Sequence, residues 1–199
     1  MLALTVVVFG RTAWIGYNWW QGQNDARDVV AVLASAAPGS AILPLKNIVR
    51  ADPAFRWQRH YAWGEDTFRH LPTLAVPFAH AFVPAVFTAR GKQPLVVRPP
   101  WASIAVPEGS LQSTGVLICP AWLEAEAIAA PFLRNWREHF DYVLVLNADQ
   151  PDQYVGTALP GGLQLTAESA FARLYKVERG FLADAKPATS VACPDLSDL

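Results

Sequence analysis

The apolar stretch at residues 2–20 limits what this chain can fold into more than any other feature. It reads LALTVVVFGRTAWIGYNWW, and Arg11 is its only charged residue. As a helix it would be about 28 Å long at ~1.5 Å per residue, close to the ~30 Å hydrocarbon core of a bilayer. The stretch predicts a membrane helix over residues 1–22, either the end of a last transmembrane segment or a single anchor.

Arg11 and the aromatic residues refine this prediction. An arginine at the centre of a bilayer costs about 2.5–3.5 kcal/mol unless it faces other protein, which favours a helix packed in a larger bundle. The aromatic side chains gather at the end of the stretch, as they do at membrane–water interfaces. We therefore expect two partners, membrane lipid and the transmembrane portion of a parent or partner protein. The residues expected at the membrane interface are Trp14, Tyr17, Trp19 and Trp20.

The N-terminus has two other interpretations. A signal peptide needs a basic first region and a small-residue cleavage site, and the sequence has neither. Alternatively, residues 4–9 (LTVVVF) are the buried first strand of a soluble nucleotide- or sugar-binding α/β enzyme. The glycines that follow, Gly10 and Gly16, fit neither a dinucleotide-binding loop nor a phosphate-binding P-loop, so the membrane helix is favoured.

Composition agrees with a chain that is part membrane-associated and part globular. Hydrophobic residues make up 52% of the sequence and charged residues 17%, against about 25% charged in an ordinary soluble domain. The net charge of −1 gives no global attraction to nucleic acid, which is not expected as a partner. The two cysteines, Cys119 and Cys193, exclude a cysteine-rich metal site. We predict two unrelated buried thiols, with a single disulfide as the alternative.

The rest of the chain predicts an α/β domain over residues 23–180, with a small mixed sheet and flanking helices, followed by a weakly ordered tail at 181–199. One helix is expected to start with Asn24 or Asp25 as its cap. A second is expected over 122–140, with Pro131 either dividing it or starting its second half. A further short strand is expected over 116–118, where the residues are apolar. The main strands are predicted near 41–45, 73–78, 94–98, 141–147, 163–167 and 171–177, the last two as a hairpin.

No catalytic constellation is recognisable in the sequence. There is no GxSxG motif, and the four histidines lack the spacing of a zinc site. We therefore predict no catalytic residue, no metal and no cofactor for this chain alone. The histidines are His60, His70, His80 and His139.

Segment 56–70 is the one part of the sequence with a suggestion of ligand binding. Arginines interleaved with aromatic residues can hold a phosphate while they stack on a sugar or a lipid headgroup. The alternatives are a partly buried loop with solvated arginines, and an anchored interaction module that recruits a protein through Trp57 and Trp63. The candidates for phosphate or headgroup binding are Arg56, Arg59, His60, Arg69 and His70.

A resemblance to a known family rests on HLPTLAV (70–76), AFVPAVFTARGKQPL (81–95), FDYVLVLN (140–147) and LQLTAESAFARLYKV (163–177). In this order they resemble the C-terminal extramembrane domain of uncharacterised bacterial polytopic membrane proteins related to GT-C-type glycosyltransferases. The resemblance implies a bacterial inner-membrane protein with its domain on the periplasmic side. It also implies a non-catalytic role in lipid-linked sugar or glycan metabolism, because the family's catalytic loop has no counterpart here.

Overall fold

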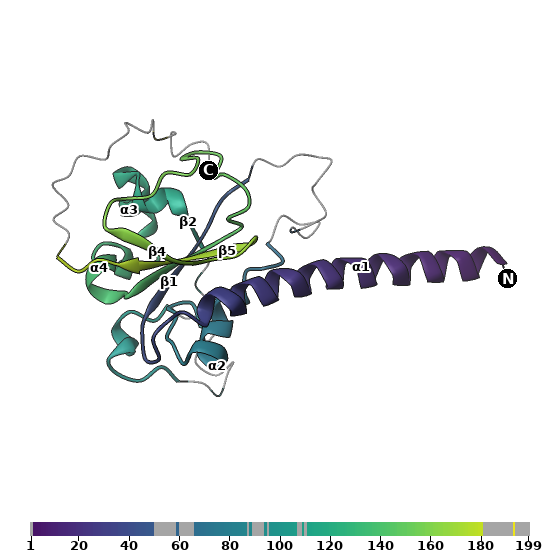
Figure 1. Ribbon diagram of the computed structural model, residues 1–199, viewed down its shortest axis with the longest axis horizontal. Helices are drawn as coiled ribbons and strands as arrows, with labels where there is room; N and C mark the ends of the chain where they lie inside the picture. Colours follow the sequence, from purple (N-terminus) through teal and green to yellow (C-terminus); the bar gives the residue numbers. More distant parts are fainter. Residues whose placement is uncertain are drawn as a thin grey trace.

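The computed structural model describes most of the chain as an α/β sandwich with a projecting N-terminal helix (Figure 1). The described residues are 2–49, 59, 66–86, 88, 94, 96–106, 109, 111–180 and 193. The α/β class predicted from the sequence is confirmed. Of the predicted tail at 181–199, only Cys193 lies within the described residues.

Five strands form one mixed sheet in the order β2-β1-β3-β5-β4. β1 is parallel to β2 and β3, whereas β5 is antiparallel to both β3 and β4. The strands predicted near 41–45, 141–147, 163–167 and 171–177 are confirmed, including the hairpin. Their bounds are β1 Ile42–Lys46, β2 Gln112–Ser113, β3 Tyr142–Leu146, β4 Leu163–Glu168 and β5 Ala172–Val177.

Pro44 lies in the middle of β1, a position that a proline rarely occupies in an inner strand. Along β1, successive backbone N–H groups point to opposite sides of the strand. The N–H of Ile42 donates to the carbonyl of Phe82 on one side, and that of Asn47 donates to the carbonyl of Leu146 in β3 on the other. Pro44 shares the side of Ile42. β2 pairs with β1 only from Leu45 onward, so the missing N–H of Pro44 removes no bond from the ladder.

Helices cover both faces of the sheet and form two apolar cores. On one face the second half of α1 (Leu2–Leu33) packs with η1 (Leu71–Leu74) and α2 (Ala75–Ala79). The other face is covered by short helices and by η2 (Trp101–Ser103). All five residues of β3 are buried, as expected for a strand covered on both sides. The remaining helices are η3 Thr114–Leu117, α3 Pro120–Glu126, η4 Pro131–Leu133 and α4 Trp136–His139.

α1 is one unbroken helix across the boundary between the apolar stretch and the domain. The predicted helix start at Asn24 or Asp25 is therefore wrong, because the backbone is already helical when it reaches them. Residues 4–9 are also helical, so the alternative that makes them the first strand is wrong. Only the second half of α1 meets the sheet, where Val29 and Leu33 are completely buried.

Within the part of the chain that the structure describes, no helix combines the length and the apolar character needed to cross a membrane. The membrane helix predicted over 1–22 is thus not found as a crossing span. Its length was sufficient, but Arg11 and Asn18 lie within it and lower its mean hydropathy.

Two of the six main strands that were predicted are wrong. Residues 73–78 form the end of η1 and most of α2, because Pro72 occupies a first-turn position that favours helix, and Ala75 and Ala79 share a buried face. Residues 94 and 96–98 form no strand, and residue 95 lies outside the described part. Prolines at 94, 99 and 100 deprive this segment of N–H donors for a ladder.

The strand and helix predictions around residue 120 also need correction. Residues 116–118 belong to η3 and its cap, and the strand expected there, β2, lies just before them. The single helix predicted over 122–140 is three short helices: α3, η4 and α4. Pro131 begins η4, which agrees with the expectation that this proline starts the second half of the segment.

Cys119 and Cys193 form a disulfide, with their Cα atoms 5.7 Å apart. The prediction of two unrelated thiols is therefore wrong. Cys119 is completely buried in the core beneath α3, whereas Cys193 is exposed. The two residues are separated by 74 positions, and only the folded chain brings them together.

Candidate functional site

The projecting half of α1 is the most unusual surface of the molecule (Figure 1). Its large apolar side chains are between 43% and 73% exposed, and they lie on all sides of the helix. A surface helix of a soluble domain normally carries a polar face, whereas a helix that is apolar all round is normally buried. We call residues 2–20 of α1 the projecting half. Its exposed apolar residues are Leu4, Val6, Val7, Val8, Phe9, Trp14, Ile15, Tyr17, Trp19 and Trp20.

The four residues predicted at a membrane interface all lie on the projecting half. Trp14, Tyr17, Trp19 and Trp20 are each about half exposed or more. The rings of Tyr17 and Trp20 lie one helical turn apart, with centroids separated by 6.4 Å. The four side chains point to different sides of the last turns before the domain, as the 3.6-residue repeat requires. This arrangement gives the helix an aromatic collar where it meets the α/β sandwich.

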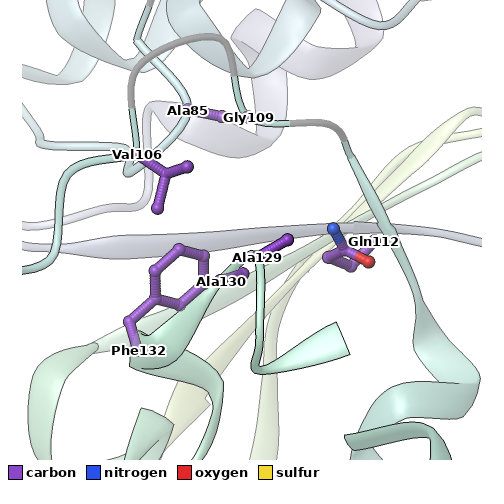
Figure 2. A pocket seen from close by; sticks show the side chains of 7 residues that line it. All are labelled: Ala85, Val106, Gly109, Gln112, Ala129, Ala130 and Phe132. Atoms are coloured by element: carbon purple, nitrogen blue, oxygen red, sulfur yellow. The ribbon is translucent and has the colours of Figure 1, made fainter. Parts of the chain in front are cut away.

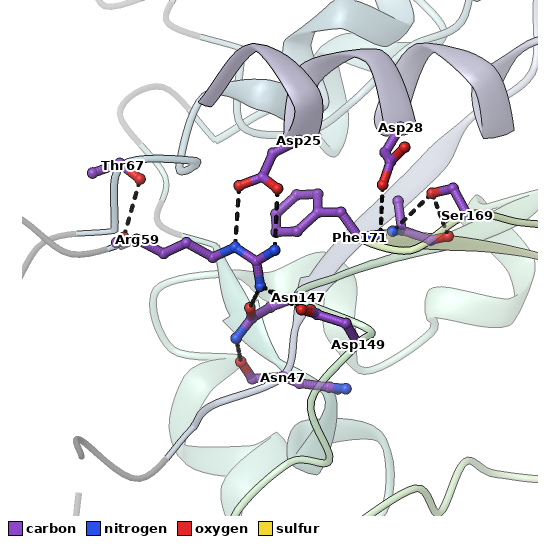
Figure 3. A network of polar contacts seen from close by, with 10 residues as sticks. Asp25, Asp28, Asn47, Arg59, Thr67, Asn147, Asp149, Ser169 and Phe171 are labelled. Carbon is purple, nitrogen blue, oxygen red and sulfur yellow. Dashed lines mark hydrogen bonds and ion pairs between the residues drawn. The ribbon is translucent and has the colours of Figure 1, made fainter. Parts of the chain in front are cut away.

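A partly buried ion-pair network joins α1 to the sheet immediately after this collar (Figure 3). The guanidinium of Arg59 donates to both carboxylate oxygens of Asp25, each at 3.1 Å. It also donates to Asp149 at 2.8 Å and to the side-chain oxygen of Asn147 at 2.6 Å. The same guanidinium lies 4.5 Å above the ring of Phe171. We call Asp25, Arg59, Asn147, Asp149 and Phe171 the junction network.

Burial shapes the electrostatics of the junction network. The pKa of Asp25 is raised above its usual 3.8, mainly because the carboxylate is desolvated, and hydrogen bonds from Arg59 oppose this shift only in part. The pKa of Arg59 is lowered by its own desolvation, but its carboxylate partners outweigh that effect and leave it raised overall. Arg59 is therefore always charged, and the network depends on its two acidic partners.

A further contact fixes the next turn of α1. The carboxylate of Asp28 accepts a hydrogen bond of 2.8 Å from the backbone N–H of Phe171, at the start of β5 (Figure 3). Asp25 and Asp28 lie one turn apart, so α1 is attached to the sheet at two successive levels. The helix therefore enters the domain at a defined angle.

The five predicted phosphate- or headgroup-binding residues have different outcomes. Arg59 is engaged by two carboxylates of its own chain, so its sequence pattern indicated a charged contact but not its partner. Arg56 and His60 lie outside the described residues. His70 is exposed, and its carbonyl accepts from the hydroxyl of Thr73 at 2.7 Å. Arg69 precedes it in the same turn and is partly buried. Headgroup binding there stays a prediction.

The carboxyl ends of the parallel strands carry a cluster of polar residues that the sequence did not single out. Asp152 is buried and accepts bonds from the hydroxyls of Ser113 and Thr114 at 3.2 and 3.3 Å. The Thr114 hydroxyl also donates to Asn47, and Asn147 donates to the carbonyl of Asn47. The carboxylate of Asp152 further accepts from the backbone N–H groups of Ile48, Tyr154 and Val155.

This cluster closes the sheet edge rather than presenting a reactive group. The carboxylate of Asp152 accepts hydrogen bonds from several directions, including the hydroxyls of Ser113 and Thr114. In an α/β sheet this edge is where ligands usually bind. One signal in the sequence could have located this cluster: the polar segment LNADQPD (146–152) at the end of β3. Polar residues directly after a buried strand often lie at such an edge.

The direction of α1 relates this edge to the projecting half. Asp25 is linked through Arg59 to Asn147 at the carboxyl end of β3, whereas the backbone N–H of Ala37, just beyond the helix, donates to the hydroxyl of Tyr142 at the start of β3. α1 therefore runs antiparallel to β3. The projecting half extends past the carboxyl ends of β1 and β3, on the side of the polar cluster.

A small pocket lies beside β2, on the other face of the sheet (Figure 2). Its volume is about 190 Å³, and Gln112 has the only polar side chain among the described lining residues. No acid–base or metal chemistry is provided by this lining. Nor does any group of histidine, cysteine, aspartate and glutamate in the described ranges suit a metal ion. The lining residues are Ala85, Val106, Gly109, Gln112, Ala129, Ala130 and Phe132.

Comparison with known proteins finds no matching family model, no matching curated protein and no matching solved structure.

Proposed function

We propose that this chain is a non-catalytic extramembrane α/β domain, attached through the projecting half of α1 to the membrane-embedded part of a larger protein or protein complex. That assembly would resemble a GT-C-type glycosyltransferase and act on lipid-linked sugars or glycans. The observation that carries the proposal is the exposed apolar surface on all sides of a helix whose other half is locked into the domain.

The energetics favour a covered helix. Burying one large aliphatic or aromatic side chain contributes roughly 1.5–3 kcal/mol, and ten such residues of the projecting half are exposed. Exposed apolar patches of this kind mark protein or membrane contacts. Arg11 and Asn18 disfavour a helix surrounded only by lipid, so the proposed surroundings are helices of a membrane-embedded partner, with lipid at the aromatic collar.

The direction of α1 supports a capping role. Because the projecting half leaves the domain past the carboxyl ends of β1 and β3, the sheet edge that covers the buried residues Asn47, Asn147 and Asp152 is turned towards the proposed partner. Such an edge can shape the floor or wall of an acceptor site without performing the chemistry itself. The junction network would keep the domain at a constant angle above that site.

The disulfide supports the proposed periplasmic side. Disulfides form and persist in oxidising compartments and are rare in a reducing cytosol. The Cys119–Cys193 bond joins residues 74 positions apart, beneath α3. A chain exported to the periplasm would form this bond during folding.

Membrane fractionation tests the proposal. We expect the full chain, expressed in a bacterium, to remain with the membranes after carbonate washing. Replacing two exposed apolar residues of α1, as Val7→Gln with Phe9→Gln, should release a large part of it, because glutamine keeps the helix but removes apolar surface. The matched control is Val96→Gln with Ile128→Gln, where both residues are 81% exposed on the domain. Recovery of the unmodified chain in the soluble fraction would contradict the proposal.

A further inference from the structure

Arg11 is isolated on the projecting half. The described acidic residues form no ion pair with it, and its side chain is exposed. Asp25 is the nearest acid along the chain, about 21 Å further on at ~1.5 Å per residue, and it is bound to Arg59. The residues one turn away are apolar on both sides: Val7, Val8, Trp14 and Ile15.

From these observations we propose, resting on the function proposed above, that the membrane-embedded partner places a carboxylate opposite Arg11. An arginine keeps its charge in any protein environment, so burial cannot neutralise it. When the helices of a partner cover α1, the charge of Arg11 needs a counter-ion, and the covering helices must supply it. A carboxylate matches the planar guanidinium with two parallel hydrogen bonds.

The position of Arg11 favours a protein carboxylate over a lipid phosphate. Arg11 lies at the middle of the apolar stretch, about 14 Å from Leu2 and from Trp20 at ~1.5 Å per residue. A long side chain can reach the interface only when it lies near the end of such a stretch. The counter-ion therefore belongs to a neighbouring helix at the same depth, and it selects one partner and one register for α1.

Carbodiimide crosslinking tests this directly. In the full-length Arg11→Lys variant, the new side chain keeps the charge while it is protonated. After it loses a proton to solvent, the neutral amine can attack a carboxylate that a membrane-permeant carbodiimide has activated. The carbodiimide leaves as a urea, and an amide bond joins residue 11 to the acid. Mass spectrometry of the membrane fraction should show residue 11 linked to an Asp or Glu of another protein. The Arg11→Gln variant, which lacks the amine, should show no adduct at that position.

Three results would overturn the inference while the proposed function stands. They are membrane retention without any adduct at residue 11, an adduct with the carboxylate of phosphatidylserine, and an adduct with an acid of a second copy of this chain. Failure of the proposed function is seen separately, as release of the unmodified chain from the membranes. Neither variant changes a residue that packs in the domain, so misfolding does not complicate the comparison.

Discussion

At the scale of single residues, Arg59 shows how one side chain connects parts of the fold that are distant in sequence. It bonds to Asp25 on α1 and to Asn147 and Asp149 after β3. Its backbone carbonyl accepts from the N–H and hydroxyl of Thr67 at 2.8 and 3.1 Å. The angle of α1, the end of β3 and the approach to η1 therefore all depend on this residue.

Replacing Arg59 tests that dependence. We expect Arg59→Met to lower the free energy of unfolding by about 2 kcal/mol, between the values for exposed and fully buried ion pairs, because Asp25 is left desolvated without a partner. Arg134→Met is the matched control. Arg134 pairs with Glu124 on the surface, so its loss should cost less than about 1 kcal/mol. Urea denaturation of both variants gives the comparison, and equal losses would contradict a structural role for Arg59.

The effect of Arg59→Met should also depend on pH. Burial raises the pKa of Asp25, so the folded state takes up this proton more readily than the unfolded state does. In wild type, the stability contributed by Asp25 is therefore fully present below its unfolded pKa of 3.8 and is lost as pH rises through the higher folded pKa. Removing Arg59 removes an influence that lowers this pKa, and raises it further.

The destabilisation caused by Arg59→Met should consequently shrink as pH falls, because protonated Asp25 needs no cationic partner. Urea denaturation of wild type and variant at about pH 7.5 and about pH 4.5 measures this. A loss of stability that grows towards the lower pH would show that the sign is wrong.

At the scale of elements, the close approach of η3 and α3 depends on one glycine. A Cβ atom at Gly115 would lie 2.4 Å from Cζ3 of Trp122, whose side chain is 1% exposed in the core. Ser113 caps η3 by accepting from the N–H of Gly115 at 3.0 Å, so the backbone there is also held. The side-chain cap of Ser113 begins η3 directly after β2.

We expect Gly115→Ala to destabilise the protein by about 1–3 kcal/mol, the usual range for overpacking a core. The control is Gly10→Ala on the projecting half, where an added Cβ meets nothing within 4 Å. That variant should be neutral or slightly stabilising, because alanine favours helix over glycine. Thermal and urea denaturation compare the stabilities of the two variants. A Gly115→Ala protein as stable as wild type would contradict the prediction and would mean that Trp122 can shift.

At the scale of the whole molecule, the disulfide limits the unfolded state more than any local contact does. Closing a loop between residues 74 positions apart lowers the entropy of the unfolded chain, with an effect of about 2–4 kcal/mol for native disulfides. The bond also links the exposed Cys193 to the core beneath α3, where Cys119 lies. The C-terminal region is thereby joined to the face of the sheet opposite α1.

Two serine variants separate the crosslink from the packing. We expect Cys193→Ser to lower the free energy of unfolding by about 2–4 kcal/mol, and chemical reduction of wild type to do the same. Cys119→Ser should cost roughly 1 kcal/mol or more beyond that, because its hydroxyl would be buried in an apolar core. Urea denaturation with and without a reductant measures these values, and a reductant effect in either variant would contradict the assignment.

Much of the sheet could be predicted because its signals are local. The run YVLVL in β3 is buried on both faces, and the alternating polarity of β4 and β5 identifies a hairpin. Residues 73–78 misled the prediction, since a short apolar run with a proline fits a strand or a helix equally. Burial of Ala75 and Ala79 against α1 decided that case.

The candidate site also has features that local sequence predicted and features that it could not predict. The sequence by itself determined that residues 2–20 are apolar, that aromatic residues gather at their end, and that Arg11 is alone among them, because these properties belong to adjacent positions. Only the tertiary structure decided that α1 continues unbroken into the domain, that Arg59 pairs with Asp25 and Asp149, and that the cysteines are joined. Such contacts join residues tens of positions apart, and their partners are selected by packing and desolvation in the folded chain rather than by any local pattern.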